Sequence, residues 1–590
     1  MAGKKEKRNE SQHVLSLFID ANLYKKFCSK LYKQPVLKLV QKMAEKTKAH
    51  EMATKQREIS VSEFFAKNRH LLGFDNPRKA LLMAVKEACD NSLDACEEAR
   101  LMPEIYVELQ QIKEDRFKII IEDNGPGIVK EQIPKIFGKL LYGSKFHRLR
   151  CSRGQQGIGI SAVLLYGQMT TGKGMHITSK IGEKHDAHFY EIHIDTQKNE
   201  PIIRQDKIIE WKKNQGTRIE IELQGTYQKG KQSVDEYLKE IALINPHAKI
   251  TYRTPEKETI TYERGVNQLP IEAKEIKPHP YGVELGILIR MLQSTTSGTV
   301  ASFLQNDFCR VSQSVSQEIC DKAKVSPRAR PSTIARDEAE ALYNAIQNTK
   351  IIAPPTDCLS PLGEDALIKG LKKEINAEFY CAISRPPSVY RGYPFLIETA
   401  LAYGGNLEKD EPIKIMRFAN RVPLLYQQGA CATTESVVDT SWKNYGLSQS
   451  KESIPIGPVT VVVHMVSVWV PFTSEAKEAI AHYPEIVKDM KLALQDCGRK
   501  MFSYIRKTVR AREQQDKINL FEKYIPELAN ALSNLSGMKM IEIEANLKKV
   551  LQKGMKDLLA EVQESKETEI KGKNIAFGEK QTTLAEATDG

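Results

Sequence analysis

The chain has 590 residues, of which 41% are hydrophobic and 27% are charged, and its formal net charge at pH 7 is +12. This length predicts several domains, and the composition is typical of a folded globular protein rather than a disordered or fibrous one. No apolar run approaches the ~20 residues that a membrane-spanning helix needs, and the basic start MAGKKEKRNESQ adjoins no hydrophobic signal core. We therefore expect a cytoplasmic protein with no membrane contact. The positive charge is moderate for this length and does not by itself indicate nucleic-acid binding.

The first 58 residues form a basic, lysine-rich N-terminal extension. Apolar residues at helical spacing predict a helix within residues 13–49, although Pro35 interrupts the pattern. Two interpretations stay open. The extension is a binding appendage, or it is translated from upstream of the true start, with Met52 as the first native residue.

The ten cysteines are scattered along the chain and include no CxxC pair. This arrangement predicts reduced thiols in a cytosolic protein rather than a disulfide or zinc framework. Cys89 and Cys96 lie within a predicted helix, and we expect both to pack in the core.

The segment VKEACDNSLDAC (residues 85–96) predicts an amphipathic helix. Its apolar residues recur at steps of three and four, which gives one buried stripe: Leu82, Val85, Ala88, Cys89, Leu93 and Cys96. Glu87 and Asn91 are four residues apart and therefore share a face. A glutamate there could activate water as a general base, and the asparagine oxygen is a hard ligand suited to Mg²⁺. For an isolated pair, a solvated polar face is the commoner explanation.

The segment IIIEDNGPGI (residues 119–128) predicts a buried strand that ends at a carboxylate. Asp123 follows the β-branched run, and Gly125 and Gly127 allow other groups to approach the backbone closely. Asp123 could accept a hydrogen bond from an exocyclic amine such as that of adenine. An ordinary turn after a strand is the alternative.

A glycine-rich segment, GQQGIG (residues 154–159), precedes an apolar run that predicts a helix over residues 160–168. Glycines at the start of a helix expose backbone N–H groups, which can bind phosphate. No strand leads into this segment, so a dinucleotide-binding βαβ unit is not predicted. The GxxxxGK[ST] pattern of a Walker A loop is also absent here.

The order and spacing of these three segments resemble the three boxes of the GHKL ATPases, and Gly216-Thr217 matches a fourth element of that family. Further segments resemble the B subunits of archaeal DNA topoisomerase VI: ISVSEFFAKNRHLLGFDNPRKAL, FGKLLYGSK, KPHPYGV, RFANRVPLLY and WKNYGL. The resemblance runs from about residue 59 to about residue 526 and covers most of the chain.

This resemblance implies an α+β multidomain fold. We expect a strap and a Bergerat-type α/β sandwich ATPase domain over 59–275, a small helix-two-turn-helix domain over 276–353, and an α/β transducer domain over 354–516. A long helix is predicted over residues 475–514 near the end of the transducer. The remaining tail, 517–590, is predicted to be helical over 524–559 and disordered over 565–590.

The strap, residues 59–73, is expected from the resemblance to cross to a partner subunit when ATP closes a dimer. The alternative is a short amphipathic helix docked on its own domain through Phe64, Phe65, Leu71 and Leu72. In the helix-two-turn-helix domain, basic residues could contact DNA phosphates or form a solvated surface: Lys322, Lys324, Arg328, Arg330 and Arg336.

The resemblance also assigns roles to individual residues. Glu87 is expected to activate water, Asn91 to bind Mg²⁺, and Asp123 to bind adenine. Arg421 stands where the family commonly has a lysine that reaches the nucleotide from the transducer; an arginine keeps the charge. The other expected ATP contacts are Gly127, Ser144, Lys145, Gly154, Gln155, Gln156, Gly157, Ile158, Gly159, Ile160, Ser161 and Thr217.

The function implied by the resemblance is that of the ATP-hydrolysing B subunit of a type IIB DNA topoisomerase. Such a protein dimerises on ATP and gates the passage of one DNA duplex through a break in another, relaxing or decatenating DNA. A separate A subunit in an A2B2 heterotetramer cuts the DNA, so this chain alone is not expected to cleave it. The expected location is the cytoplasm, in association with the nucleoid.

Two alternatives remain at this stage. One is a GHKL ATPase clamp of another class, of the mismatch-repair or chaperone type, which the KPHPYGV and WKNYGL segments argue against. The other is a non-catalytic DNA-binding scaffold with a decayed nucleotide site, which the intact Glu87, Asn91 and Asp123 argue against.

Overall fold

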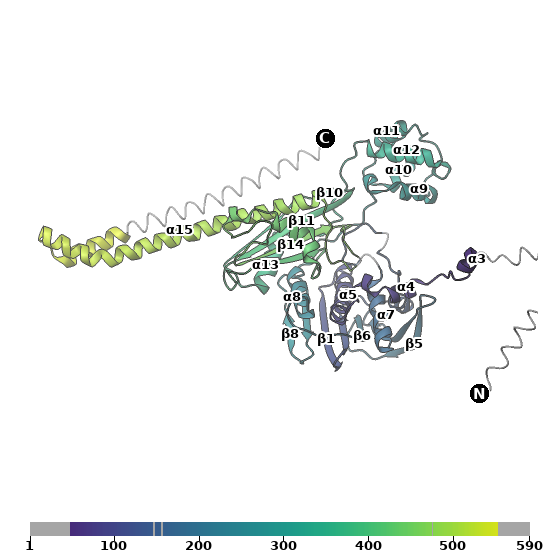
Figure 1. Cartoon of the computed structure of the whole chain (residues 1–590), viewed down its shortest axis with the longest axis horizontal. Coiled ribbons are helices and arrows are strands. Elements are labelled where there is room, and N and C mark those ends of the chain that lie inside the picture. Colours follow the sequence, from purple (N-terminus) through teal and green to yellow (C-terminus); the bar gives the residue numbers. More distant parts are fainter. Residues whose placement is uncertain (1–47, 146–147, 155–156, 475, 553–590) are drawn as a thin grey trace, which may run out of the picture.

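The computed structural model describes residues 48–145, 148–154, 157–474 and 476–552. Most of the predicted N-terminal helix and the whole segment 565–590 lie outside these ranges. Figure 1 shows two β-sheets with their helices, a separate bundle of short helices, and one long helix that extends away from the second sheet. Within the described ranges, no helix is both long and apolar enough to cross a bilayer.

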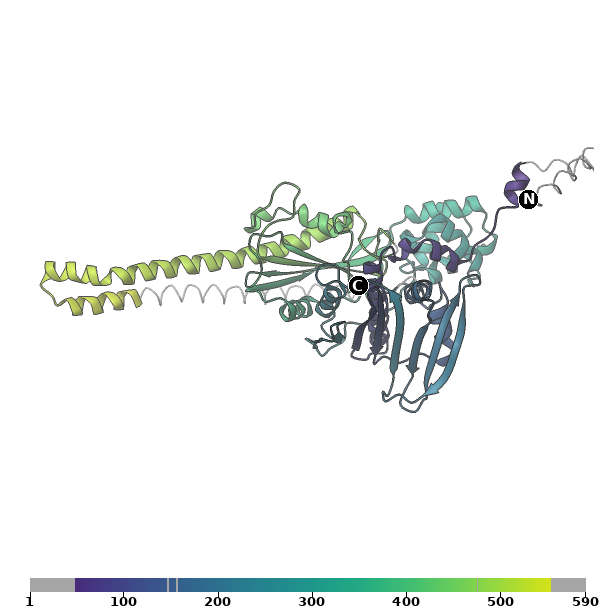
Figure 2. The same cartoon turned by 60° about the horizontal axis from the view of Figure 1, so that its bottom comes forward.

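The first sheet has eight strands, and helices cover it to form the predicted α/β sandwich, which is confirmed. β1 and β7 pair in parallel, whereas the other neighbouring strands are antiparallel (Figure 2). The strand order is β5 (Glu200–Ile209), β4 (Ala187–Asp195), β3 (Met175–Lys180), β6 (Gly216–Gln224), β2 (Arg116–Asp123), β1 (Glu104–Lys113), β7 (Lys249–Arg253) and β8 (Thr259–Tyr262). The helices that share its core are α5 (Pro77–Glu98), α6 (Ile133–Gly138), α7 (Gly159–Thr171) and α8 (Val234–Ile244). We call this unit the first-sheet domain.

The central helix α5 begins at a capped N-terminus. The side chain of Asn76 accepts a hydrogen bond from the backbone N–H of Lys79, and Pro77 occupies the first turn, where its missing N–H costs nothing. The predicted apolar stripe is buried, and it includes both Cys89 and Cys96. The predicted helix is therefore confirmed, and its apolar stripe directs the polar residues between them away from the core.

The strap region forms α4 (Val61–Lys67), preceded by α3 (Lys48–Ala53), and α4 docks on its own domain. Ser60 donates to the carbonyl of Thr196, and the hydroxyl of Ser62 donates to Asn199 at 2.8 Å. Phe65 packs against the core, whereas Phe64 remains exposed. This arrangement matches the docked amphipathic helix that the sequence offered as the alternative.

Four short helices form a bundle with a core of its own, and Figure 1 shows it apart from the first sheet. They are α9 (Leu285–Ser294), α10 (Val300–Asp307), α11 (Gln313–Ala323) and α12 (Arg336–Gln347). Arg328, Arg330 and Arg336 are all exposed on this bundle. The helical character predicted for this region is confirmed.

The second sheet has six strands and is covered on both faces. The strands are β9 (Phe379–Ser384), β10 (Ser388–Tyr390), β11 (Tyr393–Tyr403), β12 (Lys414–Ala419), β13 (Val422–Pro423) and β14 (Val459–Ser467). α13 (Glu364–Glu374) and α8 pack on one face, and α14 (Ala432–Val438) and the long helix pack on the other. Every residue of β14 is buried, as expected for a central strand between two layers. We call this unit the second-sheet domain.

The long helix α15 runs from Pro484 to Ser536, so the predicted span 475–514 was wrong at both ends. Residues 476–483 form a loop that buries Ala479 and Ile480, and the helix begins at a proline in its first turn. Its first part, up to Met501, is buried on the second sheet, and the remainder projects from the body (Figure 1).

The helix predicted over 524–559 is interrupted in the structure. α15 ends before Gly537, whose φ of 74° is the left-handed conformation that glycine adopts readily. A further helix begins at residue 540 and packs back on α15, which buries Ile525, Ala529 and Ile543 between them. The single predicted helix is therefore a helical hairpin within the described residues.

Candidate functional site

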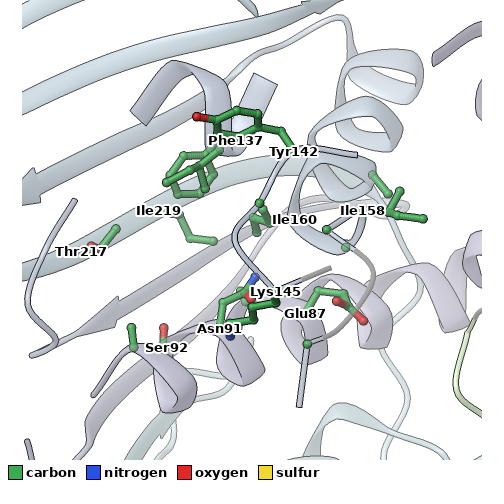
Figure 3. Close-up of a pocket in the computed structure, with 18 of the residues that line it drawn as sticks. Glu87, Asn91, Ser92, Phe137, Tyr142, Lys145, Ile158, Ile160, Thr217 and Ile219 are labelled. Carbon is green, nitrogen blue, oxygen red and sulfur yellow. The ribbon is translucent and has the colours of Figure 1, made fainter. Parts of the chain in front are cut away.

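A cavity of about 600 Å³ opens between α5, α7 and the edge of the first sheet at β2 and β6 (Figure 3). It brings together most of the residues singled out from the sequence: Glu87, Asn91, Asp123, Gly127, Ser144, Lys145, Gly154, Gly157, Ile158, Gly159, Ile160 and Thr217. Ser161 is buried in α7 and does not line the cavity. Gln155 and Gln156 lie outside the described residues.

Asp123 is the last residue of β2 and forms the polar floor of the cavity. One carboxylate oxygen accepts hydrogen bonds from the backbone N–H groups of Gly125 (2.9 Å) and Thr217 (3.1 Å). The other accepts from the hydroxyl of Ser92 at 2.9 Å. Burial raises the pKa of Asp123 above its usual value, although these hydrogen bonds oppose the shift. The second oxygen has room for one more donor, and the chain ends of β2 and β6 fix its position.

Ser92 was not predicted from the sequence. It follows Asn91 directly, but its hydroxyl points to the strand end across the cavity, so only the fold gives it a role. Apolar residues that were also not predicted line the same cavity and could cover the flat faces of a base: Ile121, Ile128, Ile136, Phe137, Tyr142 and Ile219.

Glu87 projects from α5 beside the start of α7. A side chain at Gly159 would place its Cβ 1.8 Å from a Glu87 carboxylate oxygen, so only glycine allows this approach. Lys86 Nζ lies 3.2 Å from the other oxygen and 3.3 Å from Asp90. Burial opposes ionisation of Glu87, but Lys86 and then Lys477 outweigh it and hold its pKa below the ordinary value. Glu87 is therefore ionised at neutral pH, as a general base must be.

Lys145 pairs with Asp94 in this structure. The distance from its Nζ to the carboxylate is 2.5 Å, and the backbone N–H of Gly154 donates to the same oxygen at 3.3 Å. Arg153 holds the other oxygen at 2.9 Å. Burial opposes ionisation of Asp94, but Lys145 and Arg153 more than compensate and lower its pKa to about 2. Two groups expected to bind phosphate are thus held by a carboxylate at the edge of the cavity.

The structure does not bring Arg421 to the cavity. Its guanidinium lies 2.8 Å from Glu97, behind the cavity wall. The cation that reaches the cavity from the second-sheet domain is Lys477, in the loop before α15. Its Nζ donates to the carbonyl of Arg153 at 2.9 Å, and burial lowers its pKa although nearby carboxylates oppose the shift. No local pattern marks Lys477 as a ligand, because its position depends on contacts between two domains.

Glu97, one turn beyond Asp94 on α5, joins three basic side chains. It accepts from Arg153 at 2.6 Å, from His247 at 2.8 Å and from Arg421 at 2.8 Å. Burial opposes its ionisation, but Arg153 and then Arg421 hold the pKa of Glu97 well below its usual range. Both arginines are buried, so Glu97 compensates charges that have no access to solvent.

We expect Glu97→Gln to destabilise the protein by about 3–5 kcal/mol at pH 7, because removing one member of a buried ion pair leaves the other charges uncompensated. A lowered pKa in the folded state means that the carboxylate stabilises the fold above its unfolded pKa, and that this stabilisation is lost as the pH falls. The difference between wild type and variant should therefore shrink below about pH 4. Urea denaturation between pH 7 and pH 3 measures it.

The matched control is Glu98→Gln. Glu98 is exposed and pairs with Arg150, and such surface pairs contribute at most about 1 kcal/mol. Equal denaturation midpoints for Glu97→Gln and wild type at pH 7 would contradict the structural assignment of Glu97.

Comparison with known proteins places this geometry in a family. Residues 76–226 match the model described as histidine kinase-, DNA gyrase B-, and HSP90-like ATPase. Residues 354–517 match the model described as topoisomerase VI B subunit, transducer. Among solved structures, the B-subunit of the DNA gyrase from Myxococcus xanthus aligns with 76% of this chain and 96% of that chain, at 9% identity and a TM-score of 0.38, which is too weak to support an inference.

Three curated relatives are named as B subunits of type 2 DNA topoisomerase 6. The protein from Methanococcoides burtonii is 48% identical over 504 residues, which are 85% of this chain and 81% of the relative. The protein from Methanosarcina acetivorans is 49% identical with the same coverage. The protein from Archaeoglobus fulgidus is 46% identical over 85% of this chain and 83% of its own length. With this identity along most of both chains, and with Glu87, Asn91 and Asp123 gathered in one cavity, the chain belongs to the family of type 2 DNA topoisomerase 6 B subunits.

Proposed function

We propose that this chain binds and hydrolyses ATP in the cavity beside α5 and thereby drives the passage of one DNA duplex through another. The observation that carries the proposal is the convergence of an ionised glutamate, an asparagine and a strand-end aspartate on one cavity of about 600 Å³. Membership of the family of topoisomerase 6 B subunits supports the same function.

Asp123 and Thr217 would bind the base. The exocyclic amine of adenine donates to the free lone pair of Asp123, whose other lone pairs are held by Ser92, Gly125 and Thr217. Because each of these donors is fixed by the backbone or by α5, the acceptor is oriented before the ligand arrives. Guanine has no amine at the equivalent position, so this contact favours adenine.

The phosphates would lie at the start of α7. Free N–H groups at a helix N-terminus attract anions, and Lys145 and Lys477 add positive charge from two sides of the cavity. To reach a phosphate, Lys145 must leave Asp94, which stays neutralised by Arg153. The nucleotide therefore replaces one anionic partner of Lys145 with another.

Glu87 would act as the general base. A water placed between its carboxylate and the γ-phosphate gives a proton to Glu87 as its oxygen bonds to phosphorus. The bond from phosphorus to the bridging oxygen of ADP breaks, which releases ADP and phosphate. Lysine charge and backbone N–H groups stabilise the charge on the transferring group, which supplies most of the rate in reactions of this type.

The site suits Mg²⁺ only in company with a nucleotide. Asn91 offers one hard oxygen, and it faces Gly154, at whose position a Cβ would lie 3.7 Å from that oxygen. Mg²⁺ commonly takes one or two protein oxygens and completes its shell with phosphates and water. Asn91 would hold the ion, which supplies charge neutralisation to the phosphates when bound.

DNA passage requires a partner that this family's name implies. We propose that an A subunit cuts the DNA, that two copies of each protein assemble, and that α4 crosses to the second copy when ATP binds. The exposed Arg328, Arg330 and Arg336 of the helical bundle would contact DNA phosphates. This activity would take place at the nucleoid in the cytoplasm.

Glu87→Gln should reduce ATP hydrolysis about 10²–10⁴-fold, because an amide cannot accept the proton of the attacking water. Binding of a non-hydrolysable ATP analogue should persist, since the substitution keeps the size of the side chain. Phosphate release and isothermal titration calorimetry measure the two properties. Turnover at the wild-type rate would contradict the role of Glu87.

Asp123→Asn should weaken the binding of both ATP and adenosine about tenfold or more, because a buried charged acceptor is lost at the base. The losses for the two ligands should be similar, since neither depends on the phosphates. Calorimetric titration with each ligand tests this, with circular dichroism as the control for folding. Unchanged affinities would overturn the assignment of Asp123 to adenine.

Relaxation of supercoiled DNA should require this chain, an A subunit and ATP together. Agarose gel assays that omit each component in turn measure this requirement. Relaxation or cleavage by this chain alone would overturn the proposed division of labour between the two proteins.

A further inference from the structure

The turn that joins β12 to β13 has an unusual backbone. Ala419 pairs with Val422, so Asn420 and Arg421 are the two residues of a tight hairpin turn. Their φ angles are 47° and 63°. Two consecutive positive φ angles are typical of type I′ turns, which favour glycine and asparagine, and an arginine there costs roughly 1 kcal/mol. Contacts of the two side chains must compensate for this cost.

Asn420 uses its whole amide to join the two domains. Its NH₂ group donates to the carbonyls of Ser152 (3.1 Å) and Ser467 (2.9 Å). Its oxygen accepts from the backbone N–H of Ser467 at 2.9 Å and from the thiol of Cys151 at 3.2 Å. Ser467 ends β14 of the second-sheet domain, whereas Cys151 and Ser152 lead directly into the glycine-rich segment of the first-sheet domain.

Arg421 reaches the same segment by a second route. Its guanidinium pairs with Glu97 at 2.8 Å, and Glu97 in turn holds Arg153, the residue before Gly154. Arg421 has no other acidic partner among the described ion pairs. Neither Asn420 nor Arg421 lines the cavity. Both side chains therefore end at residues 151–154, one directly and one through a single carboxylate.

The turn has a rigid base. The backbone N–H of Arg421 donates to Nε2 of His464 at 2.9 Å, so the other ring nitrogen carries the proton and donates to Glu398 at 2.9 Å. Glu398 also accepts from the backbone N–H of Gly363 at 2.7 Å. His464 and Glu398 are fully buried in the second sheet. A turn mounted on this network cannot shift without moving the sheet.

We propose that Asn420 and Arg421 are positioning residues that hold the segment 151–154, so that Gly154 and the start of α7 are in place for the phosphates of the nucleotide. This role rests on the proposed ATP function, and it is separate from that of Lys477, which enters the cavity itself. Occupation of the phosphate site and the position of the second sheet are then linked through this turn.

The experiment uses the full chain with Asn420 and Arg421 both replaced by glycine. Glycine adopts both φ angles without strain, so the turn is kept while its contacts are removed. The apolar interface between α8 and α13 remains to hold the domains together. The readout is calorimetric affinity for adenosine, ADP and a non-hydrolysable ATP analogue.

We expect affinity for the ATP analogue to fall about tenfold while affinity for adenosine stays within about twofold of wild type, with ADP between them. A role limited to general stability would not separate the three ligands in this way. Arg421→Lys, which keeps a charge for Glu97, should recover part of the loss.

The matched control is Lys257→Gly. Lys257 is an exposed residue with a φ of 69° in the β7–β8 turn, so the same backbone change and charge loss occur far from the cavity. Its affinities should equal those of wild type. If the double variant does not fold, Asn420→Gly alone carries the test, because it leaves the Arg421–Glu97 pair intact, and it should weaken the analogue more than adenosine.

Equal losses for all three ligands, or no loss, would overturn the positioning role. These outcomes differ from failure of the proposed function itself, in which the wild-type chain would not bind the ATP analogue. The two proposals are therefore tested separately by the same titrations.

Discussion

A row of carboxylates along one side of α5 is the constraint on which the site and the domain interface both depend. Glu87, Asp90, Asp94 and Glu97 follow one another at steps of three and four residues, so they share one face of the helix. All are wholly or largely removed from solvent. Buried charges of one sign are tolerated only when opposite charges reach them, and here the cations come from several distant segments: Lys86, Lys145, Arg153, Arg421 and Lys477.

This requirement explains why the second-sheet domain packs where it does. Arg421 and Lys477 belong to that domain, and each meets carboxylates of α5 at one end of the cavity. Near them, Lys79 of α5 pairs at 2.5 Å with Glu478, the residue after Lys477. The five cations exceed the four carboxylates, and burial keeps the pKa of Asp90 raised despite Lys86. The region therefore carries an excess of positive charge, which suits an anionic ligand such as a triphosphate.

The sequence predicted those parts of the site that depend on local pattern. The apolar stripe of residues 85–96, the strand ending at Asp123 and the glycines before α7 each carry their structural reason within a dozen residues. Local pattern cannot predict contacts such as that of Arg421 with Glu97, which are 324 residues apart. The exchange of roles between Arg421 and Lys477 follows from this limit, since both are basic residues in the same domain and only packing decides which one faces the cavity. The helix boundaries failed for a related reason: residues 476–483 contain alanine and isoleucine at spacings that suit a helix, but tertiary contacts bury them in a loop.

The same loop connects the cavity to the most extended part of the molecule. Lys477 lies only seven residues before Pro484, where α15 begins, and the first turns of α15 are buried on the second sheet. A helix of 53 residues is about 80 Å long. A rotation of a few degrees at its base therefore moves its far end by several ångströms, whereas the cavity needs only the exchange of one ion pair. Because Asn420, Arg421 and Lys477 all belong to the body that carries α15, a change in the phosphate site cannot be accommodated by the loop alone. It must either strain the contacts on α5 or turn the second sheet, and the helix turns with it.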